Sequence, residues 1–237
     1  MSEVRSVSGV EPDTALVYIE DVSKQYQTGG ELLPILESVR LVLNRGETVS
    51  VTGESGCGKS TLLNMISGLD HPTSGRVVVE TIEVSGLRES AAGHFRNQVL
   101  GMVFQSHHLL RDFSLLENVA MPALISGAPI KSAKDKAHHL LEMVGIADRY
   151  AHFPNSVSGG ERQRAAVARA LINDPRLILA DEPTGNLDER HSEGVQQLLF
   201  DVVERSNASL LLVTHDRRFA AKADRRFVLH RGQLEEA

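Results

Sequence analysis

The sequence predicts an α/β fold with a phosphate-binding core, and three stretches carry this prediction. Residues 53–61, GESGCGKST, match the pattern G-x-x-x-x-G-K-[ST] and lie between an apolar run at 49–52 and an amphipathic run at 61–69. Residues 177–180 and 210–213 are continuous apolar runs, which are typical of central parallel strands buried on both faces. Strand, glycine loop and helix in this order favour a nucleotide-binding protein.

The loop at 53–61 supplies groups that suit a bound phosphate. Gly53, Gly56 and Gly58 let the backbone turn its N–H groups towards an anion at the N-terminus of the following helix. Lys59 is expected to reach the β- and γ-phosphates, and the Ser60 hydroxyl to bind Mg²⁺. The single cysteine is expected to be a small loop residue and not a nucleophile, because the motif contains no dedicated base. The other loop residues expected at the nucleotide are Glu54, Ser55, Cys57 and Thr61.

Composition limits the cellular setting. The 237 residues suffice for one compact α/β unit, and a net charge of -6 without a dense Lys/Arg run argues against a nucleic-acid partner. Residues 1–14 are polar, lack the apolar segment of a secretion signal and are expected to form a flexible leader. No apolar run approaches the roughly 20 residues that span a bilayer. We therefore expect a cytoplasmic location, with any membrane role depending on a separate chain.

The region before the loop is predicted to form an antiparallel layer. Residues 15–19 and 39–43 are expected to be short strands, with turns around 28–31 and 44–46. Tyr26 lies between these strands in the sequence. Its ring could stack on adenine, or it could be an ordinary half-buried packing residue.

Several further strands are predicted after the loop. They are expected at residues 77–79, 82–84, 99–104 and 227–229, with a short acidic tail after the last. Gln105 follows the third of these strands. It is either a ligand group at a strand end, where open α/β sheets bind ligands, or a surface amide.

A helical insertion is predicted from residue 106 to about residue 150. Its helices are expected at 115–123 and 134–144, broken by Pro122, Gly127 and Pro129. Six apolar residues near its start are expected to divide between the core of this insertion and a groove for a partner: Leu109, Leu110, Phe113, Leu115, Leu116 and Val119. Two histidine pairs are not expected to bind metal, because neighbouring side chains point apart: His107 with His108, and His138 with His139.

Three later positions place polar groups at the ends of elements. Residues 158–160, Ser-Gly-Gly, open a helix predicted at 161–172, and this turn could hold phosphate or serve only as a cap. Asp181 and Glu182 follow the apolar run at 177–180, where Asp181 could support Mg²⁺ and Glu182 could activate water as a general base. The alternative is a solvated acidic loop. His215 follows the run at 210–213 and could contact the γ-phosphate.

Together these motifs resemble the ATP-binding subunit of ATP-binding cassette (ABC) transporters. The matching set is GESGCGKST at 53–61, Gln105, VSGGERQ at 157–163, LILADE at 177–182, NLD at 186–188, and His215. The resemblance covers essentially the whole chain, and six ordered motifs do not arise by chance. It implies a P-loop NTPase core with an antiparallel β-subdomain and a helical subdomain at about 106–160. Residues 1–237 would then form a single ABC nucleotide-binding domain that hydrolyses ATP with Mg²⁺.

The resemblance also implies a role for individual residues. Tyr26 would stack on adenine, Gln105 would sense the metal and the water, and His215 would hold the γ-phosphate. Two copies of the chain would clamp two nucleotides as a homodimer. Ser158, Gly159 and Gly160 would face the nucleotide of the opposite copy, and Asp188 would reach across the interface towards the phosphate loop of that copy.

Two stretches resemble one branch of this family more closely. Residues 95–125 and 179–188 are similar to the LolD-type ATPases of lipoprotein-releasing systems, which are related to the macrolide-exporter and cell-division ABC ATPases. This branch implies integral membrane permease partners and a peripheral position on the cytoplasmic side of the inner membrane. Arg111 departs from the proline expected in this branch. In the signature of the whole family, Val157 replaces the commoner leucine and Glu161 the commoner glutamine. The alternatives are an ATPase whose membrane partner signals to periplasmic cell-wall enzymes, or one that powers a tripartite exporter.

Overall fold

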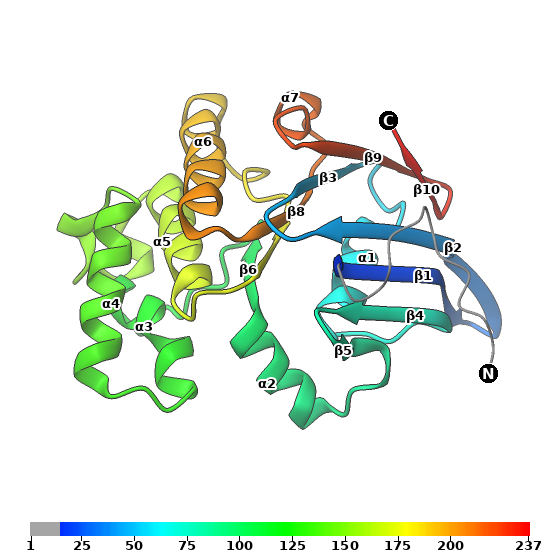
Figure 1. Cartoon of the computed structure of the whole chain (residues 1–237). Coiled ribbons are helices and arrows are strands. Elements are labelled where there is room, and N and C mark those ends of the chain that lie inside the picture. Colours follow the sequence, from blue (N-terminus) through cyan, green and yellow to red (C-terminus); the bar gives the residue numbers. More distant parts are fainter. Residues whose placement is uncertain (1–14) are drawn as a thin grey trace. The chain divides into compact units, whose positions relative to one another are not determined.

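The computed structural model describes residues 15–237, apart from the side chains of residues 189 and 190. The leader expected at residues 1–14 lies outside the described residues. Two compact units form the described chain (Figure 1). Unit 1 contains residues 15–93 and 211–237, and unit 2 contains residues 94–210. The boundary passes through helix α2 (Glu89–Val99) and strand β8 (Ser209–Val213).

Unit 1 contains the predicted antiparallel layer, a four-stranded sheet in the order β2-β1-β4-β5. Its two long strands extend well beyond the apolar runs of the sequence, because backbone pairing continues through exposed residues as far as Thr28 opposite Glu31. Only the inner half of this hairpin is buried, where residues 15–19 contribute to the core. The strands are β1 (Ala15–Thr28), β2 (Glu31–Asn44), β4 (Ser74–Val79) and β5 (Ile82–Glu83).

Unit 1 also contains the strand that leads into the phosphate loop. Strand β3 (Thr48–Thr52) pairs in parallel with β9 (Arg225–His230), and β10 (Gln233–Glu236) pairs antiparallel with β9. Helix α1 (Lys59–Ile66) follows the loop and buries its apolar face. The remaining elements are short: the 3₁₀ turn η1 (Val84–Gly86) and helix α7 (Arg217–Ala220). The acidic tail expected after β9 is therefore strand β10.

Unit 2 pairs two parallel strands, β6 (Leu100–Phe104) and β7 (Leu177–Asp181). Their register places Phe104 opposite Asp181. Because parallel strands end at the same edge, the residues that follow each strand emerge side by side. Helices make up most of the rest of the unit: α3 (Leu115–Ile125), α4 (Ile130–Met143), α5 (Gly159–Leu171) and α6 (Glu189–Ser206), with 3₁₀ turns η2 (Ala147–Arg149) and η3 (Pro154–Ser156).

Some local predictions were wrong. Pro122 does not break the insertion but lies inside α3. This helix is stabilised by a capping box formed by Ser114 and Glu117, and by the burial of Leu115 and Val119. Val99 ends helix α2 and does not begin β6, and Val84 lies in a 3₁₀ turn. Helices α2 and α6 were not predicted. Each is mostly polar, so the apolar stripe that buries one face is narrow.

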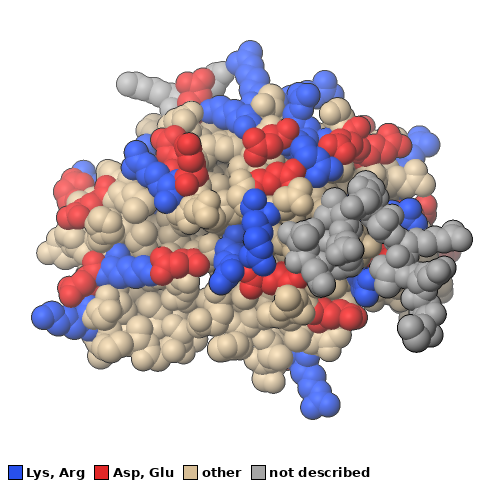
Figure 2. Space-filling view, viewed as in Figure 1, with Lys and Arg blue, Asp and Glu red and all other residues tan. Residues whose placement is uncertain are grey.

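The surface of the described residues carries both signs of charge. On the face in Figure 2, Lys and Arg side chains are interspersed with Asp and Glu, and no extended basic patch is visible among them. Within residues 15–237, no helix combines the length and the apolar character needed to cross a membrane.

Candidate functional site

The phosphate loop follows β3 and wraps around the ammonium group of Lys59. Lys59 Nζ donates hydrogen bonds to the carbonyl oxygens of Gly53, at 2.9 Å, and Glu54, at 2.8 Å, and the residue is only 8% exposed. Gly53 must lack a side chain, because a Cβ there would lie 2.4 Å from the Leu229 carbonyl oxygen. Gly58 has a φ of 107°, a left-handed conformation that favours glycine. The loop is therefore held in shape by glycine and by the lysine itself.

Helix α1 begins at the end of this loop. Its N-cap residue is Gly58, which offers no side-chain cap, and its first turn contains no acidic residue. The first N–H groups of a helix need acceptors, and the helix dipole places positive potential there. Ser60 is exposed in this first turn. The N-terminus of α1 is therefore suited to an anion, with a hydroxyl beside it.

Tyr26 is anchored by polar contacts on the same unit. Its hydroxyl donates to Asp70 Oδ2 at 2.6 Å, and Lys24 Nζ lies 4.7 Å from the ring centroid. Lys24 also forms an ion pair with Asp70 Oδ1 at 2.6 Å. Burial first, and then the Asp70 carboxylate, raises the pKa of Tyr26. The ring remains 37% exposed, so it is fixed in place but is not a core residue. Sequence reasoning missed Lys24 and Asp70; the only signal was Lys24 two positions before Tyr26 on one strand.

Replacing Asp70 with alanine tests this anchoring. The variant removes the acceptor of the Tyr26 hydroxyl and the ion-pair partner of Lys24. If Tyr26 stacks on the nucleobase, we expect the KM for ATP to rise about three- to tenfold with little change in kcat, because one net hydrogen bond is worth about 0.5–1.5 kcal/mol. Steady-state ATPase assays check this. Glu20→Ala, which breaks the ion pair with Arg76 on the same sheet, is the matched control. An unchanged KM in Asp70→Ala would contradict a role for this anchor.

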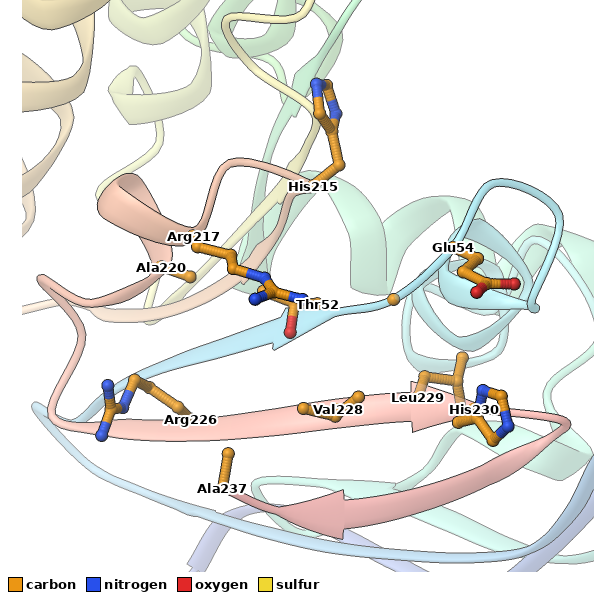
Figure 3. Close-up of a pocket in the computed structure, with 11 residues that line it drawn as sticks. Thr52, Glu54, His215, Arg217, Ala220, Arg226, Val228, Leu229, His230 and Ala237 are labelled. Atoms are coloured by element: carbon orange, nitrogen blue, oxygen red, sulfur yellow. The ribbon is translucent and has the colours of Figure 1, made fainter.

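A cavity of about 640 Å³ in unit 1 brings His215 to the start of the phosphate loop. Gly53, Glu54 and His215 all line it, and Figure 3 shows β9 along its lower side. The His215 ring points away from β9 in that view. Arg217 and Arg226 also line the cavity, which adds positive charge beside the loop. The strand ends of unit 1 therefore place two of the predicted motifs at one cavity.

In unit 2, Gln105 and Glu182 follow the paired ends of β6 and β7. Gln105 Nε2 donates to Asn186 Oδ1 at 3.1 Å, and Asn186 Nδ2 donates to the Gln105 carbonyl oxygen at 3.0 Å. A Cβ on Gly185 would lie 2.8 Å from Gln105 Nε2, so a side chain at position 185 would push the Gln105 amide aside. These reciprocal bonds fix the amide relative to the 182–187 turn. The sequence offered no signal for the role of Asn186 beyond its place in the NLD motif.

The same turn starts from a strained residue. Glu182 has a φ of 44°, a left-handed conformation that is unusual for a glutamate, and its carbonyl oxygen accepts from the Gly185 N–H at 3.0 Å. Such conformations cost of order 1–3 kcal/mol and gather at functional sites. The backbone at Glu182 is therefore set by the surrounding turn.

Ser158 caps helix α5 through a capping box. Its Oγ accepts from the Glu161 N–H at 3.2 Å, while its own N–H donates to Glu161 Oε2 at 2.7 Å. Arg149 Nε donates to the other carboxylate oxygen of Glu161 at 2.9 Å. The Ser158 N–H, the Ser158 hydroxyl and Arg149 lower the pKa of Glu161 to about 2. The serine oxygen therefore has a structural function as an acceptor at the start of α5, and its hydroxyl helps to hold the Glu161 carboxylate in its charged form.

The NLD segment packs against this turn. A Cβ on Gly159 would lie 3.2 Å from the Leu187 side chain, and one on Gly160 would lie 3.5 Å from His191. Asp188 caps α6: its Oδ1 accepts from the His191 N–H at 3.0 Å, and its Oδ2 lies 2.7 Å from His191 Nδ1. The predicted residues 158–160 and Asp188 are therefore neighbours within unit 2.

The low pKa of Glu161 makes a pH-dependent contribution to stability. A carboxyl group whose folded pKa lies below its ordinary 4.5 stabilises the fold above that pH, and the contribution is lost as the pH falls towards about 2. Glu161→Gln can keep the cap but has no charge to titrate. We expect its free energy of unfolding to fall less steeply than that of the parent chain between pH 4.5 and 2. Urea titrations at several pH values measure this, and equal slopes would refute it.

Comparison with known proteins decides the family. The sequence model described as "ABC transporter" matches residues 36–185, more than half of the chain. The chain belongs to the ABC transporter family. It is therefore an ABC ATPase, which binds and hydrolyses ATP, and the predicted family resemblance and fold class are confirmed.

Relatives of this ABC ATPase extend over its full length. It is 52% identical over 219 residues to the "Lipoprotein-releasing system ATP-binding protein LolD" of Treponema pallidum (strain Nichols), covering 92% of this chain and 97% of the relative. The protein of the same name from Xanthomonas axonopodis pv. citri (strain 306) is 47% identical over 238 residues, covering 100% and 98%. A dimeric post-hydrolysis structure of the ATP-binding cassette MJ0796 bound to ADP and Pi superimposes with a TM-score of 0.86 at 37% identity, covering 93% and 97%.

Proposed function

We propose that this ABC ATPase is the nucleotide-binding subunit of an inner-membrane complex that releases lipoproteins from the membrane. The observation that carries the proposal is the 52% identity with the lipoprotein-releasing ATP-binding protein of Treponema pallidum, across 97% of that protein. The predicted single nucleotide-binding domain over 1–237, with a helical subdomain at about 106–160, belongs to this proposal. So does a peripheral position on the cytoplasmic side of the inner membrane.

The phosphate loop is proposed to hold the triphosphate. Lys59 would exchange its bonds with the Gly53 and Glu54 carbonyls for bonds with the β- and γ-phosphates. The N–H groups of the α1 N-terminus would bind the same phosphates. The exposed face of the Tyr26 ring, fixed by Asp70, would stack on adenine.

The residues expected at Mg²⁺ provide the oxygen donors that this ion prefers: the Ser60 hydroxyl, the Gln105 side-chain carbonyl and the Asp181 carboxylate. Bound Mg²⁺ would neutralise the charge of the phosphates. Glu182 is proposed to accept the proton of the attacking water, with its position set by the strained turn. Gln105, paired with Asn186, would orient that water, and His215 would hold the γ-phosphate.

The active unit is proposed to be a homodimer that meets integral membrane permease subunits. Ser158, Gly159 and Gly160 would face the nucleotide of the opposite copy, and Asp188 would reach towards its phosphate loop. Two solved dimers of the MJ0796 cassette support a dimeric arrangement, with TM-scores of 0.86 and 0.85. Of the apolar residues assigned jointly to core and groove, Leu115 and Val119 are fully buried, whereas Leu110 and Phe113 are 48% and 39% exposed. We propose the exposed pair as part of the contact with the permease.

Purification from native membranes followed by a release assay tests this function. The tagged chain should co-purify with integral membrane subunits and, after reconstitution in lipid vesicles, release bound lipoprotein to a soluble acceptor only when ATP is added. The same complex with Glu182→Gln is the control and should retain lipoprotein. A permease that carries no lipoprotein, or release that does not require ATP, would overturn the proposal.

A further inference from the structure

The segment between β6 and α3, residues 105–114, contains neither helix nor strand, and polar side chains from two helices bind its backbone. Asn118 of α3 holds the far end: its side chain accepts from the Leu110 N–H at 2.7 Å and donates to the carbonyl oxygens of Leu110, Phe113 and Ser114, each at 3.0 Å. Helix α5 holds the near end, beside Gln105.

Arg169 of α5 makes the strongest of these near-end contacts. Its guanidinium donates to the carbonyl oxygens of His107, at 2.7 Å, and His108, at 2.5 Å. The guanidinium donates from two different nitrogens, one to each acceptor, in a fixed planar fork that an ammonium group on a flexible stem lacks. Burial lowers the pKa of Arg169, which indicates that its charge is partly removed from water. A partly buried charge is therefore placed against two backbone oxygens.

Those two residues are the strained part of the segment. His107 and His108 have φ values of 59° and 49°, the left-handed conformation that costs roughly 1–2 kcal/mol per non-glycine residue. Two such residues in succession need an external partner to persist. Arg169 supplies it by binding both carbonyl groups.

Gln105 is also held from its other side. The Phe104 carbonyl oxygen accepts from the His107 N–H at 3.2 Å and from Gln163 Nε2 at 3.4 Å, and Gln163 is a fully buried residue of α5. The His108 ring meets the Phe104 ring edge-on, with centroids 4.9 Å apart. The backbone is thus bound to α5 immediately before Gln105 and again two and three residues after it.

We propose that Arg169 is a positioning residue that fixes Gln105 to helix α5. Since Ser158 caps the N-terminus of α5, Gln105 and the 158–160 turn then move as one body within unit 2. The inference rests on the proposed function, in which Gln105 binds the metal and orients water. Arg169 itself touches neither.

The test compares Arg169→Lys with Arg164→Lys. Arg164 lies on the same helix and also donates to a backbone carbonyl, that of Val144 at 2.8 Å, but this carbonyl lies outside the 105–114 segment. The readout is the Mg²⁺ concentration that half-saturates binding of a non-hydrolysable ATP analogue. We expect Arg169→Lys to raise this Mg²⁺ concentration about tenfold, because loss of a residue that orients a metal ligand typically weakens metal binding by about 10- to 100-fold. Arg164→Lys should leave it unchanged. Hydrogen exchange of the amides at 106–108 should accelerate only in Arg169→Lys.

A double variant separates this inference from the proposed role of Gln105. Gln105→Ala should raise the Mg²⁺ requirement, and adding Arg169→Lys should raise it no further, because both changes act through one amide. An additive effect, or an equal shift in Arg164→Lys, overturns the positioning role. If Gln105→Ala raises the Mg²⁺ requirement and Arg169→Lys does not, only the positioning role of Arg169 fails. If Gln105→Ala leaves the Mg²⁺ requirement unchanged, the proposed role of Gln105 fails, and the role of Arg169 fails with it. Should Arg169→Lys not fold, Gln163→Met removes the bond to Phe104 and should give a smaller shift in the same direction, and no shift would overturn the inference.

Discussion

Replacing Glu182 with glutamine is expected to slow ATP hydrolysis by about 10²- to 10⁴-fold, the range associated with a general base. Glutamine has nearly the same shape but cannot accept the proton of the attacking water. Glu182 lies directly after β7 at a φ of 44°, and glutamine meets the same backbone demand, so the turn should be retained. ATP affinity should therefore stay close to that of the parent chain. Single-turnover hydrolysis and equilibrium nucleotide binding measure the two effects separately.

A matched control for this variant is Glu193→Gln, which makes the same change at an exposed position of α6. It should hydrolyse ATP at the parent rate. Near-parent turnover in Glu182→Gln would remove Glu182 from its proposed role. Equal melting temperatures for the two variants would show that the loss of turnover is not a loss of folding.

Replacing Lys59 with alanine is expected to weaken ATP binding by about 100-fold or more. The ammonium is proposed to bind the β- and γ-phosphates, and two charge-assisted hydrogen bonds at about 1.5 kcal/mol each correspond to that factor. The same variant leaves the Gly53 and Glu54 carbonyl oxygens without the donor that Lys59 supplies. A lower melting temperature without nucleotide should therefore accompany the loss of binding.

Nucleotide titration and thermal unfolding measure these two effects. Lys131→Ala, at an exposed lysine of α4, is the control for the loss of one positive charge and should change neither. Unchanged ATP affinity in Lys59→Ala would count against the assignment of the phosphate loop. Unchanged thermal stability would show that the two carbonyls find other donors.

The sequence was most informative where chemistry depends on neighbours in the chain. The phosphate loop, the ends of β6, β7 and β8, and the cap at Ser158 each depend on residues a few positions apart, so local patterns were sufficient to predict them. The position of the Tyr26 ring, by contrast, depends on a hydrogen bond to Asp70, 44 residues further along the chain. The backbone after Gln105 depends on Arg169, 62 residues from His107. Such partners are chosen by tertiary packing and leave no periodic signal.

The elements that sequence reasoning missed have a related physical cause. Helix α6 begins without a long apolar run and buries a narrow stripe that includes Val195, Leu199 and Val202, a pattern easily taken for polar surface. Pro122 was predicted to interrupt a helix because proline has no backbone N–H to donate. The burial of α3 against the rest of the fold outweighs the loss of that hydrogen bond. Local propensity is a weak predictor in both cases, because the deciding contacts come from other parts of the fold.

The bonds of Lys59 to its own loop have a consequence for how readily the nucleotide leaves. Lys59 Nζ donates to two carbonyl oxygens of its own loop, so a phosphate must replace these partners when it binds the ammonium. The net gain is therefore smaller than the full strength of the lysine–phosphate contact. The affinity for nucleotide is thereby moderated, and the Lys59 ammonium can return to the two carbonyl oxygens when the product leaves. An ATPase that must bind ATP and release ADP in each cycle benefits from such a balance.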